Sequence, residues 1–280
     1  MRPRRETARP TAHLVGRQPT VHLVGAGPGD PELLTLKAAR LLAEADILVH
    51  DRLVGAGVLA LARPQARRID VGKATGAHRL SQTAINRLLV ELARPGRTLV
   101  RLKGGDPFIF GRGGEEVEAL RAAGIEVDVV PGISSALGCA AAAQIPLTHR
   151  DMAQAVTFVT GHAALGHEPD LDWKALARPN QTVVVFMGVG TAGTIAARLV
   201  SAGRDPATPI AVIENGTRQN EINAFGALGN LAEVIQSAGI QGPALLIIGE
   251  VVALARRNQT AAAPGKAAKP SVSSLWEMLS

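Results

Sequence analysis

Hydrophobic and polar residues alternate in two different rhythms from Thr20 onward, with short β-branched runs separated by longer stretches of helical spacing. This alternation is typical of β-α-β units and predicts a mainly parallel sheet. The expected strands are residues 20–24, 46–50, 67–72, 97–102 and 126–130, with helices over 33–45 and 81–94. Ser81 is expected to cap the second of these helices. The pattern therefore predicts an α/β domain over residues 20–133.

A second α/β unit is expected after Pro131 and Gly132, which interrupt the pattern and are followed by a helix of small residues. Its expected strands are residues 155–160, 182–187, 209–214 and 244–248, with helices near 191–202 and 228–238. Residues 221–225 are expected to pair antiparallel, which makes this sheet mixed. We assign residues 134–257 to this domain, residues 1–19 to a basic disordered tail, and residues 258–280 to a flexible tail.

Positive charge is concentrated at the two ends of the chain. The 280 residues carry a net charge of +6, which by itself is typical of proteins that bind nucleic acid. Residues 1–19 contribute +4 and residues 256–280 contribute +3, so the remainder carries −1. Because binding to phosphate backbones needs cations on the folded surface, we expect no nucleic-acid partner.

Cys139 is the only cysteine, so no intrachain disulfide and no cysteine-based zinc cluster can form. The apolar stretch near the start is interrupted by Gly25, Gly27 and Pro28 before it reaches the length of a signal peptide. No run approaches the 18 apolar residues that a membrane span needs. We therefore expect a cytoplasmic protein with no bound metal and no membrane partner.

Two glycine-rich segments follow predicted strands, where backbone can approach a ligand closely. The first, GAGPGD at residues 25–30, lacks the G-x-G-x-x-G spacing of dinucleotide sites, and Asp46 opens the second strand instead of closing it. This disfavours NAD. For residues 25–30 a tight structural turn and a ligand-binding loop are equally compatible with the sequence.

The second segment, KGGDPFIFGRGGEE at residues 103–116, is more specific and is predicted to be a ligand-binding loop. Gly104 and Gly105 remove side-chain bulk, and the Asp106 carboxylate can accept a hydrogen bond from a ribose hydroxyl or an amine. Phe108, Ile109 and Phe110 offer an apolar face. This combination suits an adenosyl group.

The chain resembles the tetrapyrrole methylases, and within them the enzymes that methylate uroporphyrinogen III. The resemblance covers about residues 20–255 and rests on ordered motifs: GAGPGD (25–30), VHDRLV (49–54), VGK (71–73), RLKGGDPFIFGRGGEE (101–116), VVPGISSA (129–136), IPLTHRD (145–151), ENGT (214–217) and GPALLIIGEVV (242–252). It implies two α/β domains, with S-adenosylmethionine (S-adenosyl-L-methionine) in the cleft between them. The implied reaction methylates uroporphyrinogen III at C2 and C7 to give precorrin-2, in a homodimer.

The same resemblance implies roles for individual residues. It makes Asp51 the proton acceptor and Lys73 the proton donor. The positions implied to contact the cofactor and give S-adenosyl-L-homocysteine after transfer are Pro28, Gly104, Gly105, Asp106, Ile109, Ser134, Ser135, Met187, Gly216 and Ala244. For Asp51 the residues alone favour another role, an ordinary loop carboxylate paired with Arg52.

The implied substrate carries eight carboxylates, so its cleft needs cations. We expect Arg52, Arg112 and Arg150 to bind them, since all three lie in predicted loops beside the motifs. Other functions remain open: another corrin-ring or ribosomal-RNA methyltransferase, or a catalytically silent nucleotide-binding module. We expect no siroheme-forming module of the kind that some relatives carry, and the sequence does not decide between siroheme and cobalamin as the end product.

Overall fold

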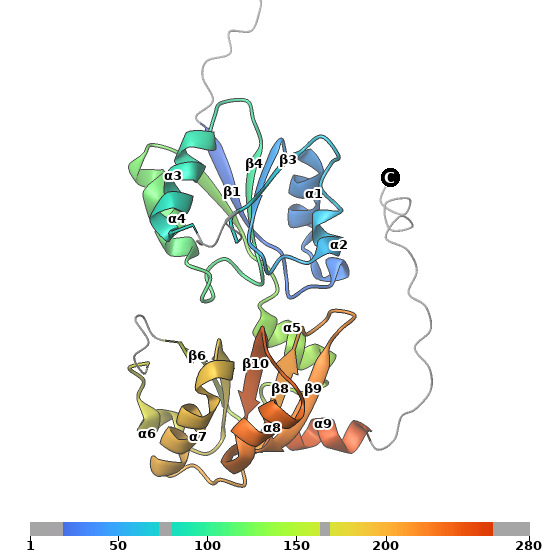
Figure 1. Cartoon of the computed structure of the whole chain (residues 1–280), viewed down its shortest axis with the longest axis vertical. Helices are drawn as coiled ribbons and strands as arrows, with labels where there is room; N and C mark the ends of the chain where they lie inside the picture. Colours follow the sequence, from blue (N-terminus) through green and yellow to red (C-terminus); the bar gives the residue numbers. More distant parts are fainter. Residues whose placement is uncertain (1–18, 73–79, 163–168, 260–280) are drawn as a thin grey trace, which may run out of the picture.

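The computed structural model describes residues 19–72, 80–162 and 169–259, and it contains two five-stranded sheets, one in each half of the chain (Figure 1). The first sheet is parallel throughout, in the order β3-β2-β4-β1-β5. Its strands are β1 (Thr20–Gly25), β2 (Ile47–His50), β3 (Arg67–Asp70), β4 (Leu99–Lys103) and β5 (Glu126–Val130). The predicted parallel α/β unit is confirmed.

Helices cover both faces of the first sheet because its central strands are apolar on both sides. Their bounds are η1 (Pro31–Leu33), α1 (Leu36–Glu44), α2 (Ala56–Leu59), α3 (Gln82–Leu92) and α4 (Gly113–Ala122). Leu41 and Val58, from α1 and α2, pack into one buried cluster, and Leu89 and Leu120, from α3 and α4, pack into the other.

The second sheet has the order β6-β7-β10-β8-β9 and is mixed, since only β6 and β7 run parallel. Its strands are β6 (Ala155–Thr160), β7 (Gln181–Phe186), β8 (Pro209–Glu214), β9 (Ile222–Ala227) and β10 (Ala244–Ile248). The predicted antiparallel strand near residues 221–225 is β9, which pairs with β8.

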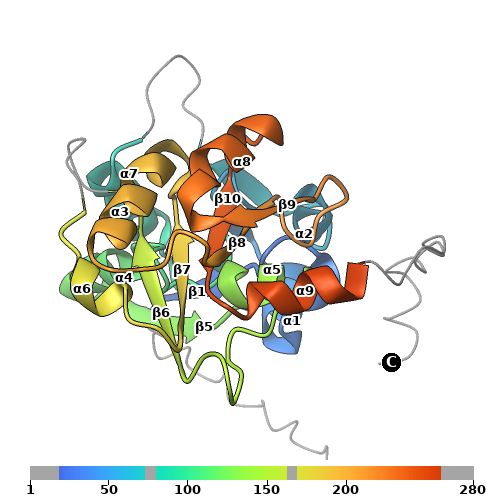
Figure 2. The ribbon, with the colours of Figure 1, turned by 90° about the horizontal axis from the view of Figure 1, so that it is seen from below.

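The second sheet is also covered on both faces (Figure 2). The helical elements of this half are α5 (Ser135–Ala142), α6 (Trp173–Leu176), η3 (Val189–Thr191), α7 (Ala192–Ser201), η4 (Leu228–Asn230), α8 (Leu231–Ser237) and α9 (Val252–Gln259). Leu199 of α7 and Leu231 of α8 belong to one buried cluster, and Ala136 of α5 and Val252 of α9 belong to the other. Helix α5 therefore packs with the second sheet although it directly follows the first.

The bounds of several predicted elements differ from those observed, and three of these differences have a clear local cause. The helix expected over 33–45 begins at Leu36, after a 3-10 turn, because the Thr35 hydroxyl caps it by accepting the Ala38 N–H at 3.2 Å. The strand expected over 67–72 ends at Asp70, whose carboxylate accepts the Gly72 N–H at 2.8 Å and turns the chain.

One predicted helix cap is confirmed: Ser81 caps α3, accepting the Ala84 N–H at 3.2 Å.

The third difference concerns residues 103–116, where the prediction of a continuous loop was wrong. Helix α4 begins at Gly113, after Arg112 with a positive φ of 58°. Glu115 and Glu116 lie in its first turn, where carboxylates are favoured by the helix dipole. These two acids were the available signal for a helix start.

No helix in the described part of the chain is long and apolar enough to cross a membrane.

Candidate active site

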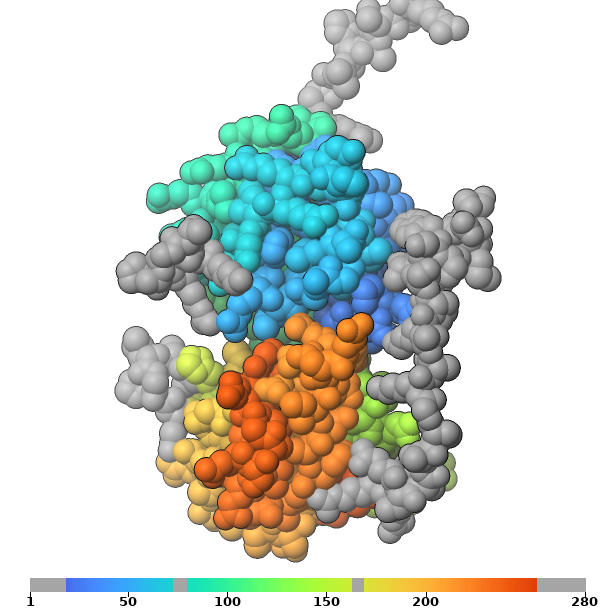
Figure 3. Space-filling view, turned by 45° about the vertical axis from the view of Figure 1, so that its right-hand side comes forward, coloured from blue at the N-terminus to red at the C-terminus, as the bar shows by residue number. Residues whose placement is uncertain are grey.

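A cavity of about 480 Å³ lies between the two halves of the molecule. It adjoins the carboxyl ends of β1, β2 and β4, the edge at which open parallel sheets commonly bind ligands. Figure 3 shows the first half, in blue to green, in contact with the second half, in yellow to orange. Among the predicted site residues, those that line the cavity are Pro28, Asp51, Gly104, Gly105, Asp106, Ile109, Arg112, Ser134, Ser135, Met187, Gly216 and Ala244.

The glycines of the first-half loops let three backbone segments touch. Gly27 and Gly105 exchange backbone hydrogen bonds of 3.2 and 2.8 Å, and both have positive φ, 68° and 65°. A Cβ on Gly132 would lie 2.3 Å from the Gly105 carbonyl oxygen, and one on Gly25 would lie 2.5 Å from the Gly132 nitrogen. Residues 25–30 therefore form a tight structural turn and also contribute Gly27 and Pro28 to the cavity wall.

The Asp106 carboxylate is engaged by the backbone on both oxygens. Oδ1 accepts the Phe108 N–H at 2.9 Å, and Oδ2 accepts the Gly132 N–H at 3.1 Å. Asp106 therefore ties the turn after β4 to the segment after β5. Its predicted contact with a ligand hydroxyl or amine would use the lone pairs that remain on these oxygens.

Apolar side chains form part of the cavity wall. Ile109 and Phe110 line it, whereas Phe108 is 55 % exposed and does not. The ring of Phe110 contacts that of Phe186 from the second half, with centroids 4.9 Å apart. This contact joins the two halves at the cavity and supplies an apolar surface for a flat ring.

Helix α5 presses against loops from both halves. A Cβ on Gly138 would lie 2.4 Å from Pro28 Cγ, and one on Gly216 would lie 2.3 Å from Cys139 Sγ. Burial raises the pKa of the Cys139 thiol to about 12, so the thiol is neutral beside the cavity. Ser134 caps the helix by accepting the Ala136 N–H at 3.3 Å.

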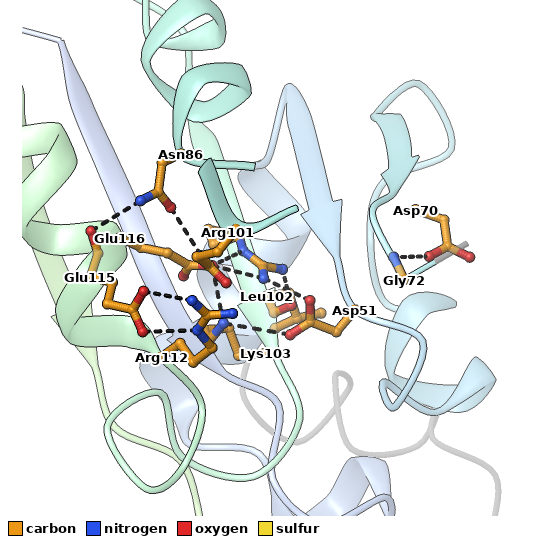
Figure 4. A network of polar contacts seen from close by, with 11 residues as sticks. Asp51, Asp70, Gly72, Asn86, Arg101, Leu102, Lys103, Arg112, Glu115 and Glu116 are labelled. Carbon is orange, nitrogen blue, oxygen red and sulfur yellow. Dashed lines mark hydrogen bonds and ion pairs between the residues drawn. The ribbon is translucent and has the colours of Figure 1, made fainter. Parts of the chain in front are cut away.

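A four-residue cluster of opposite charges stands at the wall formed by β4 and α4 (Figure 4). Arg101 Nη2 lies 2.6 Å from Asp51 Oδ1 and 2.9 Å from Glu116 Oε1. Lys103 Nζ lies 3.1 Å from the same Glu116 oxygen and 3.6 Å from Asp51 Oδ2. The side chains of Arg101, Lys103 and Glu116 are at most 4 % exposed, whereas the Asp51 side chain is 29 % exposed.

Burial lowers the pKa of the Lys103 ammonium, and the nearby Arg101 lowers it further, while Asp51 and Glu116 oppose this shift. Asp51, Arg101 and Lys103 line the cavity, and Glu116 stands behind them. The arrangement places one partly exposed carboxylate at the cavity, with its position set by two buried cations.

The remaining predicted site residues lie outside this arrangement or are already paired. Lys73 is outside the described residues. Arg52 and Arg150 are exposed and are not among the cavity-lining residues. Arg112 lines the cavity and binds Glu115 through two bonds of 2.8 and 2.7 Å, and this bonding raises the Arg112 pKa.

The partner proposed for Asp51 from the residues alone, Arg52, is not the observed one. Arg101 and Lys103 are two residues apart on β4, so both side chains point to the same face of the sheet, where they meet Asp51. Sequence reasoning did not select these two residues or Glu116. The available signal was two cations at spacing two within an otherwise apolar central strand.

Sequence reasoning also missed a contact that joins the two halves beside the cavity. The Asp30 N–H donates to Thr217 Oγ1 at 3.1 Å, and Arg218 Nη2 donates to the Leu53 carbonyl oxygen. The Arg218 side chain also covers Gly29, where a Cβ would lie 2.6 Å from Arg218 Cγ. We call Thr217 and Arg218, with these contacts, the interdomain clasp.

The fold and the cavity define an α/β protein that can hold a nucleoside-sized ligand between its two halves, next to a carboxylate. Among the described residues, no group of three His, Cys, Asp or Glu side chains could hold a metal ion. A family model described as Tetrapyrrole (Corrin/Porphyrin) Methylases matches residues 20–232. The chain belongs to this family.

Individual relatives agree with this assignment. The siroheme synthase of Psychromonas ingrahamii is 55 % identical over 230 residues, which are 82 % of this chain and 48 % of that protein. The chain thus spans about half the length of the curated relatives it matches.

Two solved structures illustrate the similarity of fold. The uroporphyrin-III C-methyltransferase of Thermus thermophilus in complex with S-adenyl homocysteine is 46 % identical, with a TM-score of 0.73 over 84 % of this chain and 99 % of that one. A cobalt precorrin-4 methyltransferase is 26 % identical, with a TM-score of 0.75 over 83 % of this chain and 95 % of that one.

Proposed function

We propose that this chain is an S-adenosylmethionine-dependent C-methyltransferase that methylates uroporphyrinogen III at C2 and C7 to give precorrin-2. One observation carries the proposal: all ten residues predicted to contact the cofactor line a single cavity, and Asp51 lines it too. Its volume of about 480 Å³ is within the usual range for small-molecule sites. The similarity to a uroporphyrin-III C-methyltransferase in complex with S-adenyl homocysteine supports the same ligand here.

When bound, S-adenosylmethionine supplies a methyl group on a positively charged sulfur. In the proposed function, the close-packed glycine turns and the Phe110–Phe186 pair hold S-adenosylmethionine in place, which aligns the reacting atoms. They also exclude water from the site. The nucleophilic ring carbon would take the methyl group as the bond from methyl to sulfur breaks, so the positive charge would pass from the sulfur to the ring. Asp51, held by Arg101 at the cavity wall, stabilises this charge and accepts the proton that the ring then loses.

We also propose that the protein acts in the cytoplasm as a homodimer, with domains over residues 20–133 and 134–257. Leu36 on α1 is 76 % exposed and Leu137 on α5 is 53 % exposed, and a second copy that covered them would remove this apolar surface from water. The charge of −1 on residues 20–255 gives no support to a ribosomal-RNA substrate. The 26 % identity to a cobalt precorrin-4 methyltransferase keeps a corrin substrate as the second candidate.

The direct test is incubation with uroporphyrinogen III and S-adenosylmethionine labelled in its methyl group, followed by counting the methyl groups on the product. We expect two. Asp51→Asn tests the role of the carboxylate. It should bind S-adenosylhomocysteine as the wild type does in calorimetry but transfer methyl groups about 100-fold more slowly. Binding without any transfer by the wild type would favour a silent binding module instead.

A further inference from the structure

Glu116 is the one member of the charge cluster that does not reach the cavity. Its side chain is fully buried, and its Oε1 accepts four hydrogen bonds. The donors, at 2.9 to 3.2 Å, are Arg101 Nε, Arg101 Nη2, Lys103 Nζ and Gln82 Nε2. The other carboxylate oxygen, Oε2, has no hydrogen-bond partner in the described structure.

Stability alone is a poor explanation for this arrangement. A buried carboxylate with one oxygen left bare loses hydration that its contacts replace only in part. A buried ion pair can often be replaced by apolar residues without loss of stability. What the negative charge of Glu116 does provide is a second anion for Arg101 and Lys103, whose other anionic contact is Asp51.

We propose that Glu116 is a positioning residue for methyl transfer, which shares Arg101 and Lys103 with Asp51 and thereby sets the position and charge balance of the Asp51 carboxylate. The inference rests on the proposed function. Two carboxylates and two cations make the cluster formally neutral. With Glu116 uncharged, both cations would act on Asp51 alone, and Asp51 would become a weaker base.

The groups around Asp51 come from several elements and are all part of the charge balance. Arg101 and Lys103 come from β4, Glu116 from α4, and the neutral Gln82 from α3. On β2, His50 Nδ1 lies 3.3 Å from the Asp51 carbonyl oxygen. Glu116 also acts over a longer range on Arg112. Asp51 and Glu116 both raise the Lys103 pKa against the effect of burial, so each carboxylate helps to keep Lys103 charged.

Glu116→Gln tests the proposal because it keeps the size of the side chain and removes its charge. We expect kcat to fall by at least about tenfold and the acid limb of its pH profile to move to lower pH, because a weaker base is protonated only at lower pH. The dissociation constant for S-adenosylhomocysteine should stay within about twofold, since Glu116 does not line the cavity.

Lys103→Met is an independent test, for which we expect the acid limb of the pH profile to shift in the opposite direction. It leaves Arg101 alone with two carboxylates, so the acid limb should move to higher pH. The double variant Glu116→Gln with Lys103→Met restores a neutral cluster and should recover part of the lost rate. Glu118→Gln, an exposed carboxylate on the same helix, is the matched control and should behave as wild type.

Two results would overturn the inference. One is a wild-type pH profile and rate in Glu116→Gln, in a protein shown to be folded by its thermal transition. The other, which also serves if that variant does not fold, is an acid limb that stays in place or moves down in Lys103→Met. A wild-type enzyme that transfers no methyl group to uroporphyrinogen III would instead overturn the proposed function, and this inference with it.

Discussion

Asp106 supports the candidate ligand site by binding backbone N–H groups with its side chain. Both of its oxygens accept backbone N–H groups, from Phe108 and from Gly132. These bonds join two loops that are separated along the chain and that both border the cavity. The carboxylate therefore contributes to the shape of the site even before any ligand is bound.

We expect Asp106→Ala to lower the free energy of unfolding of the ligand-free protein by about 1–2 kcal/mol, because the exposed Phe108 N–H and the partly buried Gly132 N–H both lose their acceptor. Binding of S-adenosylhomocysteine should weaken as well, because the turn loses its support. Denaturant unfolding without ligand and calorimetry with ligand measure the two effects. Unchanged ligand-free stability together with weakened binding would show that Asp106 acts only through direct contact.

At the scale of elements, Asp46 joins the amino end of β2 to the segment that precedes β4. Its carboxylate accepts the Thr98 N–H at 2.8 Å and pairs with Arg63. The bond from Thr98 lowers the Asp46 pKa, against the effect of burial and with help from Arg63. This acid therefore lies at the end of the sheet opposite the cavity, where it supports the register of neighbouring strands.

Since the pKa of Asp46 is lower in the folded state than its ordinary 3.8, the folded state gains stability above that pH and loses it as the pH falls through the lowered pKa. We expect Asp46→Asn to be less stable than wild type by about 0.5–1 kcal/mol at pH 7, with a difference that shrinks below pH 4. Urea unfolding at a series of pH values measures this. A difference that is constant with pH would contradict it.

At the scale of the whole molecule, the interdomain clasp closes one side of the cavity. Its contacts run from Thr217 to Asp30 and from Arg218 to Leu53, so each joins the second half of the chain to the first. Figure 3 shows the connection between β8 and β9, in orange, meeting the blue part of the first half. A ligand that contacts both halves binds more tightly when other contacts already hold the halves together.

We expect Arg218→Ala to raise the dissociation constant for S-adenosylhomocysteine by about tenfold, the cost of one lost charged hydrogen bond. Thr217→Val removes the second contact without changing a cavity-lining residue and should weaken binding in the same direction. Arg87→Ala, an exposed arginine on α3, is the matched control for loss of charge. If Thr217→Val binds as tightly as wild type, Arg218 acts by direct contact with the ligand and not through the clasp.

The sequence by itself determined the class of fold and the loops that carry the site. Strand and helix spacings are local properties, and they were sufficient to predict the parallel first sheet and the mixed second one. The glycine-rich segments were identifiable because turns at strand ends need residues without a Cβ. The charge of residues 20–255 was also readable, since it depends only on which charged residues lie between the two basic ends.

Only the tertiary structure decided which charges meet. Asp51 and Arg101 are 50 residues apart, and Asp30 and Thr217 are 187 apart, so no local pattern connects them. Sequence reasoning placed Arg52 beside Asp51 because they are neighbours in the chain, whereas strand order brings β4 next to β2 and supplies Arg101. Ion pairs depend on distance in space, and that distance is set by the packing of the sheet and not by sequence spacing.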